Sequence, residues 1–163
     1  MSVRFLADGM LGGLARWLRI LGQAVEYDSQ LTDNLLLKKA STGGIILLTR
    51  DEELYRRALQ KKIACLLVQG NVEPERLAEV SHSFNIPLEI DMAKTKCPKC
   101  GIDIQRVPKD KVVGRVPETS LRVHNEFWEC MNPECGKIYW MGGHWRQIHN
   151  TLEKARLLLA NKS

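Results

Sequence analysis

The sequence lacks several features that mark particular classes of protein. Its 163 residues contain no apolar run close to the ~20 residues that a membrane-spanning helix needs. The first residues do not follow the basic, apolar and small-residue order of a secretory signal peptide. We find no internal repeat and no low-complexity tract. These absences predict a cytoplasmic protein with no membrane partner, made of one ordinary domain or two small ones; they leave its oligomeric state open.

Aromatic residues are scarce, at 6% of the chain, and cysteine is present in an odd number, five. An odd count without an export signal argues against a disulfide framework. Cys65 stands alone inside an apolar run, where we expect a small buried hydrophobe. The other four cysteines form two close pairs, and most of the aromatic residues outside the first half of the chain lie near them.

The net charge of +5 is unevenly distributed. Residues 1–93 hold 11 Lys/Arg and 12 Asp/Glu, whereas residues 94–163 hold 13 and 7. A basic segment attracts polyanions such as nucleic acid in a salt-dependent manner. Plain solubility is the alternative explanation.

Short apolar runs alternate with helical patterns in the first half of the chain. This alternation predicts βαβ units and a parallel sheet with helices on both faces, a small three-layer α/β fold. The expected strands are Val3–Ala7, Ala24–Tyr27, Ile45–Leu48 and Ala64–Val68. The expected helices are Gly9–Gly22, Thr32 or Asp33 to Ser41, Glu52–Lys61 and Pro74–Phe84.

The pattern changes after residues 86–96, which we interpret as a linker. Short turns and strands follow, with a loop or hairpin expected at residues 108–123 and a helix from Gly143, whose apolar stripe can pack back on the first half. We therefore divide the chain into residues 1–92 and residues 93–163.

The two cysteine pairs predict one structural zinc site. Two residues separate Cys97 from Cys100, and four separate Cys130 from Cys135. Each pair is followed by glycine, which allows a tight turn, and four thiolates make the closed tetrahedral set of a structural zinc ion. A redox-active Cys-x-x-Cys motif is the alternative, but it needs no second pair. His144 and His149 are possible alternative ligands.

Three aspartates predict a second metal site. Asp8 and Asp51 follow two of the expected strands, and functional groups collect at the carboxyl ends of parallel strands. Asp33 opens a helix and can reach the same edge. Carboxylates suit Mg²⁺ or Mn²⁺, which lower the pKa of an attacking water in phosphodiester hydrolysis. A helix cap for Asp33 and turn formation for Asp8 and Asp51 are the alternatives.

Several cationic and aromatic side chains are candidates for contacts with RNA. The arginines lie close in sequence to the three aspartates, and the others follow the second cysteine pair, a mixture suited to phosphate contact and base stacking. A solvated face and core packing are the alternatives, and we assign Phe127, Trp128 and Tyr139 to packing. The candidates are Arg16, Arg19, Arg50, His144, Trp145 and Arg146.

Two parts of the chain resemble a known family. Phe5–Asp8, Leu14–Gly22 and Leu47–Asp51 resemble the PIN-like nuclease domain, and Phe127–Trp145 resembles the zinc ribbon fused to it. The combination is similar to the C-terminal domain of the Mut-seven exonuclease family.

This resemblance implies an RNase with Mg²⁺ or Mn²⁺ held by Asp8, Asp33 and Asp51, and with zinc held by the ribbon cysteines. PIN nucleases typically carry a fourth acid. Asp28 and Glu52 are weak candidates for it, and residues 69–71 carry none. A non-catalytic RNA- or ribosome-binding module is the competing interpretation. A small-molecule phosphatase would need an Asp-x-Asp motif after the first strand, which is missing.

Overall fold

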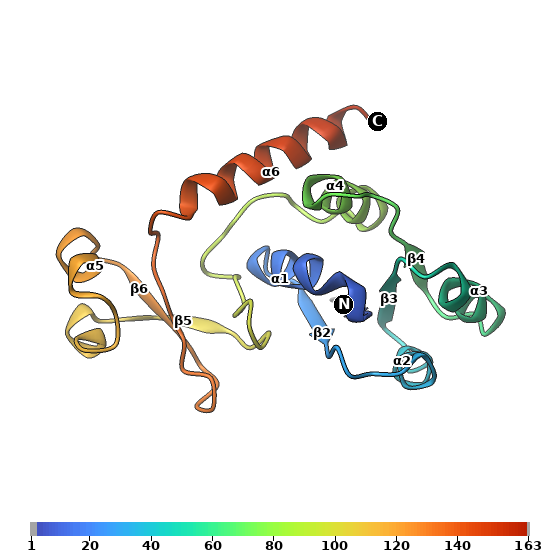
Figure 1. Ribbon diagram of the computed structural model, residues 1–163, viewed down its shortest axis with the longest axis horizontal. Helices are drawn as coiled ribbons and strands as arrows, with labels where there is room; N and C mark the ends of the chain where they lie inside the picture. Colours follow the sequence, from blue (N-terminus) through green and yellow to red (C-terminus); the bar gives the residue numbers. More distant parts are fainter. Residues whose placement is uncertain (1–2, 163) are drawn as a thin grey trace.

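A computed structural model describes residues 3–162 and arranges them around two separate sheets (Figure 1). The first part of the chain forms the helices and strands expected from its periodicity, with ends shifted by a few residues, and a 3-10 turn precedes the first helix. In chain order these elements are β1 (Arg4–Ala7), η1 (Gly9–Leu11), α1 (Gly12–Ile20), β2 (Ala24–Tyr27), α2 (Asp33–Ala40), β3 (Ile45–Thr49), α3 (Glu52–Gln60), β4 (Cys65–Leu67) and α4 (Glu73–Phe84).

The first sheet is parallel throughout, with the strand order β2-β1-β3-β4. Successive side chains of a strand point to opposite faces, and the core divides accordingly. Phe5 and Leu48 pack with residues of α1 and α4 on one face. Leu6 and Leu47 pack with residues of α2 and α3 on the other. The three-layer α/β fold predicted from the sequence is confirmed.

The second sheet is antiparallel and belongs to the cysteine-containing segment. Its strands are β5 (Ile104–Val107), β6 (Phe127–Cys130) and β7 (Ile138–Tyr139), paired in that order. Between β5 and β6, where the sequence predicts a loop or hairpin, the chain forms η2 (Lys109–Val112) and α5 (Glu118–Val123). Pro108 and Pro117 are the N-cap residues of these two short helical segments.

The last helix, α6 (Trp145–Ala160), returns to the first sheet and packs along α4 (Figure 1). Leu152 and Ala155 are fully buried in the same core as Phe5, which confirms the expected apolar stripe. Arg156, on the same helix, is half-buried and donates from Nε to the Leu88 carbonyl at 2.9 Å. Residues 93–163 thus contribute to the core of the preceding segment, and the division at residue 92 stays a prediction.

Within residues 3–162, no helix is both long enough and apolar enough to span a membrane.

Candidate functional site

Asp8 and Asp51 lie at the same edge of the parallel sheet, after the adjacent strands β1 and β3. Asp8 is only 5% exposed, and its amide donates to the Leu48 carbonyl at 3.1 Å. Thr49 joins the two acids: its hydroxyl donates to Asp8 Oδ2 and accepts from the amide of Asp51 at 3.0 Å. The parallel register therefore holds Asp8 and Asp51 on either side of one threonine.

Each aspartate is also held by its local backbone. Asp8 Oδ1 accepts from the amide of Met10 at 3.0 Å. Asp51 caps α3 by accepting from the amides of Glu53 at 2.8 Å and Leu54 at 3.2 Å. Asp33 is the first, exposed residue of α2, while Thr32 provides the cap of that helix. The cap alternative proposed for Asp33 is therefore wrong, whereas Asp8 and Asp51 each cap a local segment, the 3-10 turn η1 and α3.

The three acids share one electrostatic environment. Burial raises the pKa of Asp8 above its usual 3.8, the hydrogen bonds from Thr49 and Met10 oppose the shift, and the charges of Asp51 and Asp33 add to it. Both neighbouring charges that act on Asp8 are negative. A bound cation would relieve this repulsion, and carboxylate oxygens are the ligands that hard divalent ions prefer.

The acids form an open group and not a closed cage. In residues 3–162, only the four paired cysteines form a set of three or more possible ligand residues with all ligand atoms within 4.8 Å of one another. An open arrangement is compatible with Mg²⁺, which usually keeps several waters and binds one or two carboxylates together with substrate phosphates.

The structure also shows an acid that the sequence analysis missed. Glu73, at the start of α4, has a carboxylate oxygen, Oε2, that is buried and without a hydrogen-bond partner among the described residues. Its Oε1 lies 3.4 Å from Arg76 and faces Gly13 of α1. By contrast, Glu52 is exposed on α3, and the exposed Asp28 accepts from the amide of Gln30 in a turn. The only signal for Glu73 in the sequence is that it is a glutamate at the start of the helix after β4.

The three candidate arginines occupy three different environments. Arg16 is exposed on α1. Arg19 is 5% exposed and donates to two carbonyls, from Nε at 3.1 Å and Nη2 at 2.9 Å to Val25 and from Nη1 at 3.0 Å to Pro98. Arg50 donates to the Gly70 carbonyl in the loop after β4. Arg19 is therefore not placed with Arg16 on one phosphate-binding face.

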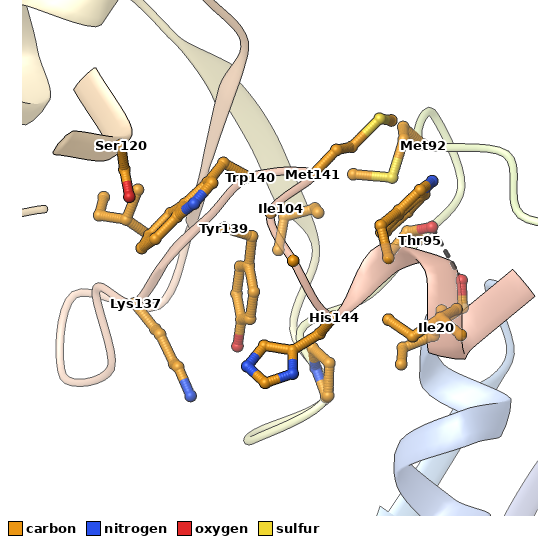
Figure 2. A pocket seen from close by; sticks show the side chains of 16 residues that line it. Ile20, Met92, Thr95, Ile104, Ser120, Lys137, Tyr139, Trp140, Met141 and His144 are labelled. Carbon is orange, nitrogen blue, oxygen red and sulfur yellow. Dashed lines mark hydrogen bonds between the residues drawn. The ribbon is translucent and has the colours of Figure 1, made fainter. Parts of the chain in front are cut away.

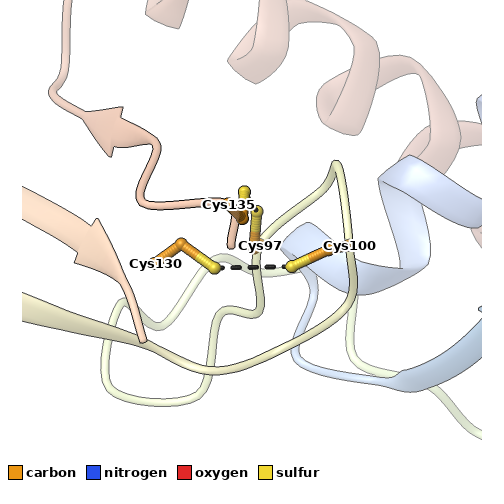
Figure 3. Close-up of side chains that lie close together, drawn as sticks. All are labelled: Cys97, Cys100, Cys130 and Cys135. Atoms are coloured by element: carbon orange, nitrogen blue, oxygen red, sulfur yellow. Dashed lines mark hydrogen bonds between the residues drawn. The ribbon is translucent and has the colours of Figure 1, made fainter. Parts of the chain in front are cut away.

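The four paired cysteines converge on one point, as their spacing predicts (Figure 3). The Sγ atoms of Cys97 and Cys135 are 3.9 Å apart, and those of Cys100 and Cys130 are 3.4 Å apart. All four are free thiols. Glycine closes both turns with positive φ, +81° at Gly101 and +57° at Gly136, a conformation that side chains other than glycine rarely adopt. This set could hold a structural metal ion such as zinc.

Hydrogen bonds favour the thiolate form of one of the four cysteines, Cys97. The Tyr139 hydroxyl lies 2.9 Å from Cys97 Sγ. Burial disfavours the thiolate of Cys97, but the bonds from Tyr139 and from the Cys100 and Lys99 backbone outweigh it and lower its pKa to about 7. Burial raises the pKa of Cys130 to about 12. Metal binding would displace the remaining protons, since the ligands must be thiolates.

The aromatic residues around the cysteines divide between packing and exposure. Phe127 and Trp128 are buried, as expected for packing residues. Trp145 is partly exposed and meets His149 edge to face at 5.3 Å. His144 and Arg146 are exposed, and neither His144 nor His149 belongs to the set of converging thiols.

Cys65, the fifth cysteine, is half-buried in β4, where burial raises the pKa of its thiol.

The segment that contains the first cysteine pair contacts the edge of the parallel sheet opposite to the acids. The amide of Lys96 donates to the Arg19 carbonyl at 2.9 Å, and the Thr95 hydroxyl donates to the Ile20 carbonyl at 2.8 Å. These carbonyls belong to the end of α1, whereas Asp8 lies before its start. At about 1.5 Å per residue, the helix separates the two regions by roughly 13 Å.

The protein combines a parallel α/β sheet, which carries aspartates at one edge, with a four-cysteine ribbon. The Mut7-C RNAse domain matches residues 3–152. The chain therefore belongs to the Mut7-C RNAse domain family, as the resemblance predicts, which gives it a nuclease- or RNA-related role. No curated protein and no solved structure matches it significantly.

Proposed function

We propose that this protein is a metal-dependent ribonuclease whose active site is the acidic edge formed by Asp8, Asp33 and Asp51. The observation that carries the proposal is the environment of Asp8, a buried carboxylate whose charged neighbours are the two other acids. A bound Mg²⁺ or Mn²⁺ would lower the pKa of the attacking water and offset the charge that develops on the phosphate.

The chain's own residues would orient this site. Asp8 and Asp51 would offer carboxylate oxygens from adjacent strand ends, and Asp33 would offer one from the exposed start of α2. Thr49 would fix the rotation of the Asp8 carboxylate through its hydrogen bond to Oδ2. The water oxygen would form a new bond to phosphorus while the bond from phosphorus to the leaving ribose oxygen breaks, and that oxygen would take up a proton.

The ribbon would act as a structural and RNA-binding module. Its four thiols fit a closed tetrahedral zinc site with no position left for a reacting water. The positive charge of residues 94–163 would attract the RNA backbone. Arg16, His144 and Arg146 are exposed enough to contact it, and Trp145 is partly so.

A cleavage assay on labelled RNA tests the proposed activity. Wild type should cut in the presence of Mn²⁺ or Mg²⁺ and not in EDTA. Asp8→Asn and Asp51→Asn should each lose more than about 100-fold in rate, since even residues that only support metal ligands cost 10- to 100-fold. Glu52→Gln is the matched control because Glu52 is an exposed acid next to Asp51, and it should keep full activity. Undiminished cleavage by Asp8→Asn would refute the proposal.

A second function, RNA or ribosome binding without cleavage, is favoured by the open spacing of the three acids. It predicts salt-sensitive RNA binding that is equal in wild type and Asp8→Asn, with no turnover under any metal condition. The same assay therefore separates the two functions.

A further inference from the structure

We propose that the cavity between the cysteine module and the end of α1 binds an unstacked base of single-stranded RNA. The cavity has a volume of about 510 Å³, within the ~300–1,000 Å³ of sites for small organic ligands. The proposal deepens the proposed function and rests on RNA being its substrate.

Several parts of the chain, from α1 to α6, build this cavity (Figure 2). Ile20 comes from the end of α1, Met92 from the linker, Tyr139 and Trp140 from the ribbon, and Trp145 from the start of α6. None of these segments makes the cavity alone, so it exists only when the ribbon is docked on α1 and α6.

The walls suit a flat aromatic ring. Tyr139, Trp140 and Trp145 are all only partly buried, so the faces or edges of three aromatic rings remain available to a ligand. Met92 and Met141 add flexible thioether side chains to the wall, which adapt to the outline of a ring. Stacking on aromatic side chains is the usual way in which proteins hold unpaired bases.

Positive charge at the same wall favours a nucleotide over a neutral aromatic ligand. The Lys137 ammonium lies 5.7 Å from the centre of the Tyr139 ring, and Lys137 and His144 are both exposed. Figure 2 shows the ammonium of Lys137 and the imidazole of His144 on the same side of the cavity. A base held against the rings would leave its phosphate within reach of these groups and of the surrounding basic segment.

The position of the cavity sets a minimum length for the substrate. It includes Ile20 at the end of α1, whereas Asp8 lies beyond the other end of that helix, whose length alone is roughly 13 Å. A stacked strand advances about 3.4 Å per nucleotide. An RNA that fills the cavity and reaches the acids as a stacked strand therefore needs about four nucleotides, which is more than a dinucleotide provides.

The test measures the affinity of zinc-loaded full-length protein for a labelled eight-nucleotide single-stranded RNA, in EDTA-free buffer without Mg²⁺ or Mn²⁺. Trp145→Leu keeps an apolar side chain at the start of α6 and should weaken binding by about 5- to 150-fold, the range for one lost stacking contact. Trp145→Phe should restore most of the affinity. Tyr55→Leu is the control, because Tyr55 is a half-buried aromatic residue on α3, which packs on the other face of the sheet.

Lys137→Gln provides a second variant that removes a charge from the cavity wall and leaves its three aromatic side chains unchanged. Lys137 is exposed, and its loss should weaken binding and reduce the slope of log Kd against log salt by about one. Zinc content and circular dichroism establish that each variant is folded. Unchanged affinity in both Trp145→Leu and Lys137→Gln would overturn the proposal, as would equal weakening by Tyr55→Leu.

Cleavage of RNAs of different length separates this proposal from the proposed nuclease. With Mn²⁺, Trp145→Leu should lower kcat/KM by a larger factor for the eight-nucleotide RNA than for a dinucleotide. Equal losses for both lengths would refute a distant base site while leaving the nuclease intact. Binding that depends on Trp145 without any cleavage would refute the nuclease and retain the base site.

Discussion

Replacing Arg19 by methionine should destabilise the protein and lower its affinity for zinc. Arg19 is buried in α1 and joins β2 to the first cysteine turn through Val25 and Pro98. Burial lowers the pKa of Arg19, and the negative charges of Cys100 and Cys97 oppose that shift. Four thiolates carry more negative charge than a divalent ion neutralises, so the guanidinium would serve as a counter-charge for the loaded site.

The size of the stability loss in Arg19→Met follows from the carbonyl groups that the substitution leaves without hydrogen-bond donors. A hydrogen bond from a charged donor contributes about 1.5–3 kcal/mol, and Arg19 donates to two carbonyls, the buried one of Val25 and the partly buried one of Pro98. Methionine retains a similar aliphatic stem, so the substitution removes mainly the charged head group. We expect a loss of about 3–5 kcal/mol in the free energy of unfolding. For a chain of this length, that loss lowers Tm by roughly 6–20 °C.

Urea unfolding followed by circular dichroism, with zinc bound and after chelation, measures this loss. Arg16→Met is the matched control, since Arg16 is exposed on the same helix and should cost less than about 0.5 kcal/mol. The Arg19→Met penalty should shrink after chelation, because the metal-free turn no longer holds Pro98 in place. Equal penalties for the two arginines, or an Arg19 penalty independent of zinc, would refute the reasoning.

Three further predictions address the acidic edge and the core. The pKa of Asp8 is raised in the folded state, so its ionisation costs stability as the pH rises above about 4. Scanning calorimetry of metal-free protein should therefore give Asp8→Asn a higher Tm than wild type near neutral pH, and no higher Tm at about pH 3. Thr49→Val should lower the cleavage rate by about 10- to 100-fold, and Thr49→Ser, which keeps the hydroxyl that reaches Asp8, should retain most of it. Leu152→Ala should reduce the urea-derived stability by about 2–5 kcal/mol, whereas alanine at the exposed Leu157 should leave it nearly unchanged.

Features that depend on local pattern were predictable from the sequence. Alternating strand and helix periodicities predicted the parallel sheet, and the spacing of Cys97, Cys100, Cys130 and Cys135 predicted their convergence. The strand ends predicted that Asp8 and Asp51 share an edge, which follows from the parallel pairing of β1 with β3. The metal-binding role of these acids stays a prediction.

Features that depend on contacts distant in sequence were not predictable. Arg16 and Arg19 are equivalent by periodicity, and only tertiary contacts, which include a bond from Arg19 to Pro98 79 residues away, bury one of them. Glu73 gave only a weak signal, a glutamate at the start of a helix, because its position against Gly13 of α1 depends on tertiary packing. The cavity beside Trp145 joins segments from both halves of the chain, and no local pattern reports on such a junction.

The distance between the acids and the ribbon is itself a consequence of the topology. In a parallel sheet with helical connections, each strand ends at one edge and each helix returns to the other. Asp8 and Asp51 therefore lie at one edge, while α4 ends at the opposite edge and the linker delivers Cys97 there. α6 begins at the cavity with Trp145 and ends where Asn161 and Lys162 line a hollow with Gly70. Since Gly70 is held by Arg50 next to Asp51, α6 and α1 both connect the proposed base site to the acidic edge, and an RNA bound at both sites would run along them.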